Sequence, residues 1–277
     1  PLEPMFSRTL QEKTVGDTDE FLTANIASNT TERVSATIKA IGTHCYVYLQ
    51  DGQTVPQERL EEIANTFDTE IYPTVTGYFG TEWNPGVDND PRITLLLLDI
   101  QDGYKPKGSY VAGYFNPGDE YLPSQLPAGS PLTTNQREML YLDVNPGDVS
   151  SQQFLSVMAH EFQHMVHFHH DSKEYTWVNE GCSQMAVFFC GFGHPSQVKA
   201  FAKTPDNSLV AWNRWNMLAN YGQTYLWNHF ILSQLLKTPA RQKAFFTALV
   251  HDPDHGIKSY ETILKPLGGG EGFRWEG

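Results

Sequence analysis

The chain has 277 residues, of which 40% are hydrophobic and 18% charged, enough for one large globular domain or a domain with a small appendage. Its net charge is −13, from 32 acidic and 19 basic residues. This balance argues against nucleic acid and anionic membranes as partners, because binding to either relies on clustered Lys and Arg. No apolar run approaches the roughly 18 residues that a membrane span requires.

Residues 34–41 and 45–49 have strand character and are separated by Gly42. They predict a small β-rich segment over residues 1–55, in which the polar residues 1–20 are expected to be loose. Residues 1–30 lack a signal-peptide pattern, and a first residue other than Met suggests a processed or truncated chain. Pro56 then opens a predicted helix with one apolar face, formed by Leu60, Ile63, Ala64, Phe67 and Ile71.

Two later runs, residues 92–100 and 139–143, predict buried strands. The residues between them, 101–135, are rich in Gly, Pro and Tyr and predict a long irregular loop, a kind of segment that often carries function. Before the first strand, residues 88–90 read Asp-Asn-Asp. Their oxygen atoms suit Ca²⁺, but their spacing does not match an EF-hand loop, so an ordinary turn is the favoured interpretation.

Residues 151–166 have helical periodicity, with Ser151 among the N-cap candidates. The apolar stripe of this helix consists of Phe154, Met158, Phe162 and Met165. The same helix carries His160-Glu161-Phe162-Gln163-His164. Side chains four residues apart lie on one face of a helix, so His160 and His164 can share a zinc ion, and Glu161 can reach a water molecule on that ion as the general base.

A catalytic zinc ion usually has three protein ligands. His170 lies six residues after His164, as in the HExxHxxGxxH pattern, but His167 occupies the position where that pattern needs glycine for a sharp turn. Residues 167–170 are therefore interpreted as a helix end with solvated imidazoles. Glu180 is the favoured third ligand, because a loop and a returning helix would bring it beside the histidine pair.

The motifs resemble those of the gluzincin metallopeptidases, in which two His and a downstream Glu bind zinc. The closer resemblance is to bacterial secreted peptidases of the hyicolysin and immune inhibitor A type, and it covers the chain from about residue 55 onward. Its matching segments are Ala159 to Phe168, Trp177-Val178-Asn179-Glu180-Gly181, Tyr221 to Leu226, Asn135 to Asp143 and Val87 to Ile93.

This resemblance implies an α+β, zincin-like fold over residues 56–277. Residues 56–170 would form a mixed-sheet upper lobe with the active-site helix, and residues 171–277 a helical lobe. It also implies that residues 108–115 supply an edge strand that pairs with extended substrate. Such peptidases often carry Asp four residues after the ligand Glu, whereas this chain has Gln184, whose amide oxygen could accept the same hydrogen bond from a zinc ligand.

The expected function is a secreted zinc endopeptidase that acts on proteins or peptides, with additional domains outside this chain not excluded by the sequence. Tyr221 is the favoured donor to the oxyanion formed during hydrolysis, and Tyr225, His229 and His194 are the alternatives. A catalytically degenerate, protein-binding relative is the rival hypothesis, although zinc binding alone would not require Glu161. Three cysteines imply no disulfide framework.

Overall fold

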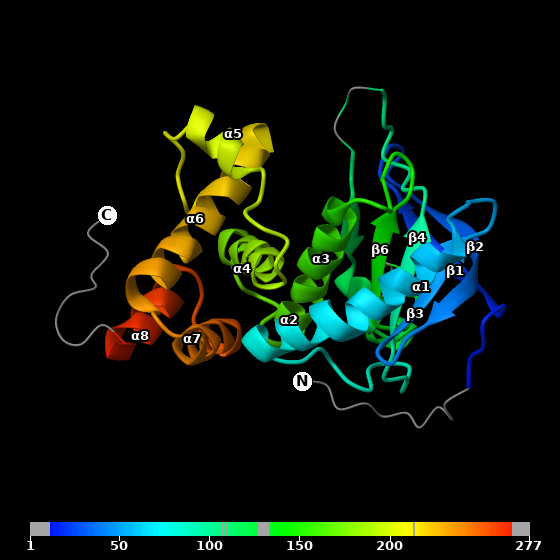
Figure 1. Ribbon diagram of the computed structural model, residues 1–277, viewed down its shortest axis with the longest axis horizontal. Helices are drawn as coiled ribbons and strands as arrows, with labels where there is room; N and C mark the ends of the chain where they lie inside the picture. Colours follow the sequence, from blue (N-terminus) through cyan, green and yellow to red (C-terminus); the bar gives the residue numbers. More distant parts are fainter. Residues whose placement is uncertain (1–11, 107, 109, 127–132, 213, 268–277) are drawn as a thin grey trace. The chain divides into compact units, whose positions relative to one another are not determined.

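A computed structural model of the chain describes residues 12–106, 108, 110–126, 133–212 and 214–267 (Figure 1). The chain divides into two compact units, one within the ranges 1–73 and 83–165 and the other within 74–82 and 166–277. In the part of the chain so described, no helix has both the length and the apolar character needed to cross a membrane.

The first unit contains a six-stranded sheet with the strand order β1-β2-β3-β4-β6-β5. Its strands are β1 (Thr18–Asn25), β2 (Thr30–Ile41), β3 (Cys45–Gln50), β4 (Ile93–Leu98), β5 (Gly113–Phe115) and β6 (Met139–Asp143). Strands β1 to β3 are antiparallel, β3, β4 and β6 are parallel, and β5 pairs antiparallel with β6. Every residue of β4 is buried, as expected for a central parallel strand covered on both faces.

Aromatic contacts join the helices of this unit to one another. Helix α1 (Gln57–Thr66) continues through a π-helical segment (Phe67–Ile71) into α2 (Tyr72–Phe79). Phe162 of helix α3 (Gln152–His170) packs edge-on against Phe67 and stacks on Tyr72, with ring centroids 5.2 Å and 5.5 Å apart. These contacts fix the rotation of α3, so Glu161, the residue before Phe162, points in a defined direction.

The second unit is helical. Its helices are α4 (Thr176–Phe189), α5 (Val198–Lys203), α6 (Met217–Leu235), α7 (Pro239–His251) and α8 (Ile257–Leu267). Trp177 at the start of α4 stacks on Tyr260 of α8, with ring centroids 5.4 Å apart, and the Tyr260 hydroxyl donates to Asn228 Oδ1 on α6 at 2.7 Å. One buried tyrosine therefore ties together three helices that lie far apart in the sequence.

The α+β class predicted from the sequence is confirmed. The strands predicted over 34–41, 45–49, 92–100 and 139–143 all form, and Ser151 Oγ accepts from the Phe154 N–H as the N-cap of α3. The predicted edge strand is present as the three residues of β5. Its predicted start, residue 108, lies between residues 107 and 109, which are outside the described part of the chain. The predicted domain boundary at residue 55 stays a prediction. Strands β3 and β4, which lie on either side of it in the sequence, pair in one sheet.

Two expectations are wrong. Residues 18–20 belong to β1 rather than to a loose segment, because β1 pairs along its whole length with β2; residues 1–11 lie outside the described part of the chain. His167 is completely buried rather than solvated. The helix does end at His170 as expected, but elements later in the sequence cover its last turn, and local sequence does not reveal such burial.

At residues 88–90 the structure shows the predicted turn. Asp88 Oδ1 accepts from the Asp90 N–H at 2.9 Å, and Asp90 Oδ1 accepts from the Arg92 N–H at 3.1 Å. Asn89 has a positive φ of 63°, a conformation that Asn tolerates better than most residues. The two aspartates thus stabilise the turn, and Asp90 Oδ2 also accepts from the Tyr46 hydroxyl at 3.0 Å.

Candidate metal centre

Helix α3 places the two histidines of the HExxH motif one turn apart. The Nε2 atoms of His160 and His164 lie 3.1 Å from each other, and their rings are nearly perpendicular, with an interplanar angle of 84°. Each ring therefore presents the same nitrogen to one point beside the helix. This arrangement follows from the spacing of four residues, because it aligns side chains along the helix axis.

The distance between the two nitrogens fits a shared zinc ion. Zinc binds imidazole nitrogen at about 2.0–2.1 Å with tetrahedral angles, which places two histidine nitrogens about 3.3 Å apart. The 3.1 Å separation between His160 and His164 is close to that value. The pair would need only a small rotation of either ring to bind the ion.

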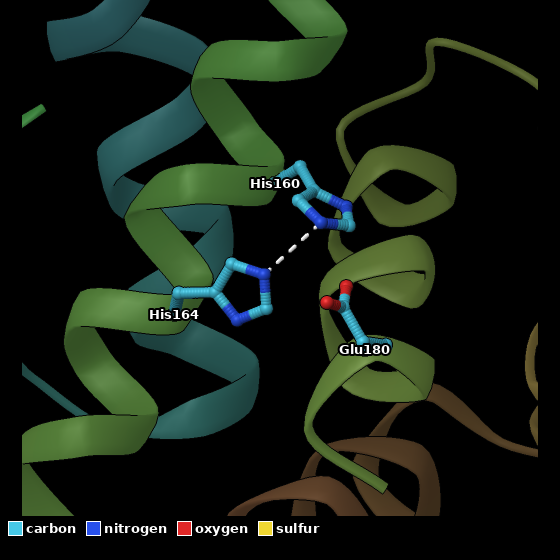
Figure 2. A group of neighbouring side chains, drawn as sticks. All are labelled: His160, His164 and Glu180. Atoms are coloured by element: carbon cyan, nitrogen blue, oxygen red, sulfur yellow. Dashed lines mark hydrogen bonds between the residues drawn. The ribbon is translucent and has the colours of Figure 1, made fainter. Parts of the chain in front are cut away.

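Glu180 supplies the third potential ligand. One donor atom from each of His160, His164 and Glu180 lies within 4.8 Å of the others (Figure 2). Figure 2 shows the two rings extending from one helix and the carboxylate of Glu180 extending from α4. These are the three residues that the sequence predicted as metal ligands, and their role as one metal site stays a prediction.

Glu161, the predicted base, is held by the backbone of the edge strand. Its side chain is buried, and its Oε2 accepts from the Phe115 N–H at 3.0 Å. Strand β5 can approach α3 so closely because residue 113 is glycine: a Cβ there would lie 2.7 Å from Val157 Cγ1 of α3. The sequence did not predict this contact, since a backbone donor leaves no mark in the residue types.

The carboxylate of Glu180 has a partner on α6. The Tyr221 hydroxyl donates to Glu180 Oε1 at 3.1 Å, and the indole ring of Trp212 packs edge-on against the Tyr221 ring at 5.1 Å. The sequence predicted that Tyr221 lies near the site but assigned it to the oxyanion. That assignment stays a prediction, and the hydrogen bond to Glu180 is also the geometry of a residue that orients a carboxylate.

Glycines in the two motifs that carry Glu180 and Tyr221 allow their helices to pack closely. A Cβ at Gly181 would lie 2.6 Å from Asn228 Nδ2 of α6, and a Cβ at Gly222 would lie 2.3 Å from the carbonyl oxygen of Gln197. Both positions therefore require the absence of a side chain. They explain in physical terms why glycine directly follows Glu180 and Tyr221.

His170, the rejected third ligand, belongs to a different group of rings. Its imidazole packs on that of His251, with centroids 3.7 Å apart, beside Gly80. Burial, helped by the nearby His251 and His169, lowers the pKa of His170 to about 4. In the described residues, His170 is absent from both groups of side chains that could hold a metal ion.

The remaining candidates for oxyanion stabilisation lie together in the second unit. Tyr225 and His194 share a hydrogen bond of 2.5 Å between the hydroxyl and Nδ1, and the His229 ring lies 5.2 Å from that of His194. Burial, with a smaller contribution from His194, lowers the pKa of His229. Gln184 is buried one turn after Glu180 on α4, and its suggested role as a hydrogen-bond acceptor stays a prediction.

The fold and the motif are those expected of a zincin-like metallopeptidase: an α+β chain with two histidines and a glutamate on one helix. No family profile matches the chain. The chain is similar to a protein named neutral metalloprotease ShpI, from Staphylococcus hyicus, with 28% identity over 269 residues. The alignment covers 92% of this chain and 56% of ShpI, so the chain spans little more than half of that relative. The predicted resemblance to bacterial metallopeptidases is thereby confirmed.

Proposed function

We propose that the chain is a zinc-dependent peptidase in which His160, His164 and Glu180 bind the ion and Glu161 is the general base. The observation that carries this proposal is the pair of Nε2 atoms 3.1 Å apart on α3, with Glu161 beside them on the same helix. The similarity to a neutral metalloprotease supports it independently.

Each residue has a task that its surroundings support. When bound, zinc would lower the pKa of a water ligand to about 7 and polarise the carbonyl group of the substrate. Glu161 would take the proton from the attacking water and pass it to the leaving amine. One of its oxygens is held by the Phe115 N–H at 3.0 Å, which limits the rotation of the carboxylate and leaves Oε1 to face the reaction.

Strand β5 supports a peptide as the substrate. It is the last strand of the sheet beside β6, and its residues Gly113, Tyr114 and Phe115 are only half-buried. An extended chain can add to such an edge through backbone hydrogen bonds, largely without regard to its side chains. Because Phe115 also contacts Glu161, a peptide aligned with β5 would run past the base. Secretion, expected from the resemblance, remains part of the proposal.

Glu161→Gln tests the assignment of the base. The amide keeps the size of the side chain but cannot take a proton, so we expect an unchanged zinc content together with loss of casein hydrolysis. Removal of a general base typically costs about 10²–10⁴ in rate. Zinc is measured by mass spectrometry of the metal, and hydrolysis by the release of fluorescent peptides from labelled, denatured casein.

Glu70→Gln is the matched control, because Glu70 is exposed and lies in the same unit. We expect this variant to keep both zinc and activity. Persistent cleavage by Glu161→Gln would show that Glu161 is not the base. A wild-type protein that binds zinc and cleaves nothing would instead favour a catalytically degenerate binding module.

A further inference from the structure

A second group of metal-binding side chains lies where α3 leads into α4. It consists of His167 in the last turn of α3, Asp171 directly after the helix, and Glu174 before α4. One donor atom from each of these residues lies within 4.8 Å of the other two. All three belong to the second unit, and none takes part in the proposed catalytic site.

The loop itself holds both carboxylates in place. The Asp171 N–H donates to the His167 carbonyl oxygen at 2.8 Å, and Asp171 Oδ1 accepts from the Lys173 N–H at 3.0 Å. Glu174 Oε1 accepts from the N–H groups of Tyr175 and Gly256. Each carboxylate thus uses one oxygen to fix the backbone, and the side chains are already ordered before any ligand arrives.

The second oxygen of each carboxylate has no hydrogen-bond partner among the described residues. Asp171 Oδ2 and Glu174 Oε2 are both buried and, among the described residues, accept no hydrogen bond. The Asp171 side chain is only 10% exposed. Buried carboxylate oxygens are costly to leave in this state, because they have lost water without gaining a donor.

His255, from the segment before α8, lies beside one carboxylate of the group. Its Nδ1 lies 3.4 Å from Asp171 Oδ2 and is also buried without a hydrogen-bond partner in the part of the chain described. A second imidazole therefore lies next to Asp171, and it comes from another segment of the chain. Burial, and to a smaller degree the charge of Asp171, raises the pKa of Glu174, against the lowering effects of its two backbone hydrogen bonds and of His255.

We propose that His167, Asp171 and Glu174 bind a second divalent cation of the zinc class, with His255 as the neighbouring imidazole beside Asp171. Imidazole nitrogen combined with carboxylate oxygen suits zinc and similar transition metals, whereas Ca²⁺ takes oxygen ligands. Two carboxylates neutralise a divalent ion, and the imidazole of His167 supplies the nitrogen ligand that zinc favours. The ion would join the end of α3 to the loop before α4, the helix that carries Glu180.

Metal stoichiometry tests this proposal separately from the catalytic site. Purified wild type, the double variant His160→Ala/His164→Ala and the double variant Asp171→Asn/Glu174→Gln are dialysed against zinc, and bound metal is counted by mass spectrometry. We expect two equivalents in the wild type and one in each double variant. The exposed pair Asp206→Asn/Glu261→Gln is the matched control and should keep two.

The decisive result is the equivalent that survives His160→Ala/His164→Ala and disappears with Asp171→Asn/Glu174→Gln. If His160, His164 and Glu180 do not bind zinc but the second site does, the wild type and His160→Ala/His164→Ala should each bind one equivalent. A wild type that saturates with one equivalent, removed by His160→Ala/His164→Ala, would overturn the second site, and this measurement does not require the amide variant to fold. Filling by Ca²⁺ but not by Zn²⁺ would overturn the assignment of the metal.

Discussion

Replacing Tyr221 by Phe separates two roles that this residue could have near the metal. The Tyr221 hydroxyl donates to Glu180 Oε1 at 3.1 Å, and the substitution removes only that donor. If the hydrogen bond orients Glu180 as a ligand, its loss weakens zinc binding. If the hydroxyl instead stabilises the oxyanion, its loss lowers kcat and leaves zinc binding unchanged.

The size of the effect on zinc binding follows from the charge of the acceptor. A hydrogen bond to a charged group contributes about 1.5–3 kcal/mol, and each 1.4 kcal/mol is a tenfold change in affinity. Tyr221 is only half-buried, so solvent can replace part of the lost interaction. We therefore expect a Kd for zinc about 10–100 times higher in Tyr221→Phe, in line with other residues that orient metal ligands.

Competition with a fluorescent chelator measures the zinc Kd, and kcat is measured with zinc in excess. Tyr225→Phe is the matched control, because Tyr225 lies one turn further along α6 and shares its hydrogen bond with His194 instead. We expect the control to keep the zinc affinity of the wild type. An unchanged Kd in Tyr221→Phe, with kcat reduced about 10²–10³-fold, would refute the orienting role and support the oxyanion role.

Three further predictions concern the third ligand, the helix packing and the pH dependence. Glu180→Ala should weaken zinc binding by more than about 100-fold and His170→Ala hardly at all, as measured with the same chelator; the opposite order would assign the third ligand to His170. Gly222→Ala should lower the free energy of unfolding by at least about 1–3 kcal/mol in urea titrations, because its Cβ would lie 2.3 Å from a backbone oxygen; an unchanged midpoint would contradict this packing. Burial raises the pKa of Asp119 from 3.8 to about 6, so between these pH values the folded state holds a proton that the unfolded state has lost. The free energy of unfolding should therefore fall as the pH rises from about 4 to about 6, by up to about 3 kcal/mol. Asp119→Asn should lose this fall when both proteins are compared without metal, and an equal pH slope in the two would contradict the raised pKa.

The sequence predicted the elements whose apolar patterns are self-contained. Strand β4 is apolar at nearly every position, and α3 repeats apolar side chains at helical spacing, so each can be recognised without its neighbours. The motif could be recognised for the same reason, since His160, Glu161 and His164 lie within about one turn of one helix. Strand β1 was missed because Phe21 is its only fully buried hydrophobic residue, and its pairing with β2 is what makes it a strand.

Contacts between segments that lie far apart in the chain could not be predicted from the sequence. Phe115 contributes only its N–H to Glu161, and any residue type except Pro can donate in this way. The group around Asp171 was missed for a related reason. His255 follows Asp171 by more than 80 residues, and nothing in their spacing indicates that the two side chains meet.

The spacing along α3 shows why burial matters for the interpretation of its histidines. His160, His164, His167 and Asp171 follow one another at intervals of four, three and four residues, which is the periodicity of a single helix face. A polar stripe with this spacing, opposite an apolar one, ordinarily indicates a face in contact with water. Here His167 is completely buried and Asp171 nearly so, and α3 therefore needs partners other than water along much of this face. A divalent cation bound by His167, Asp171 and Glu174 would be such a partner at the end of α3, where the second carboxylate oxygens of Asp171 and Glu174 accept no hydrogen bond among the described residues.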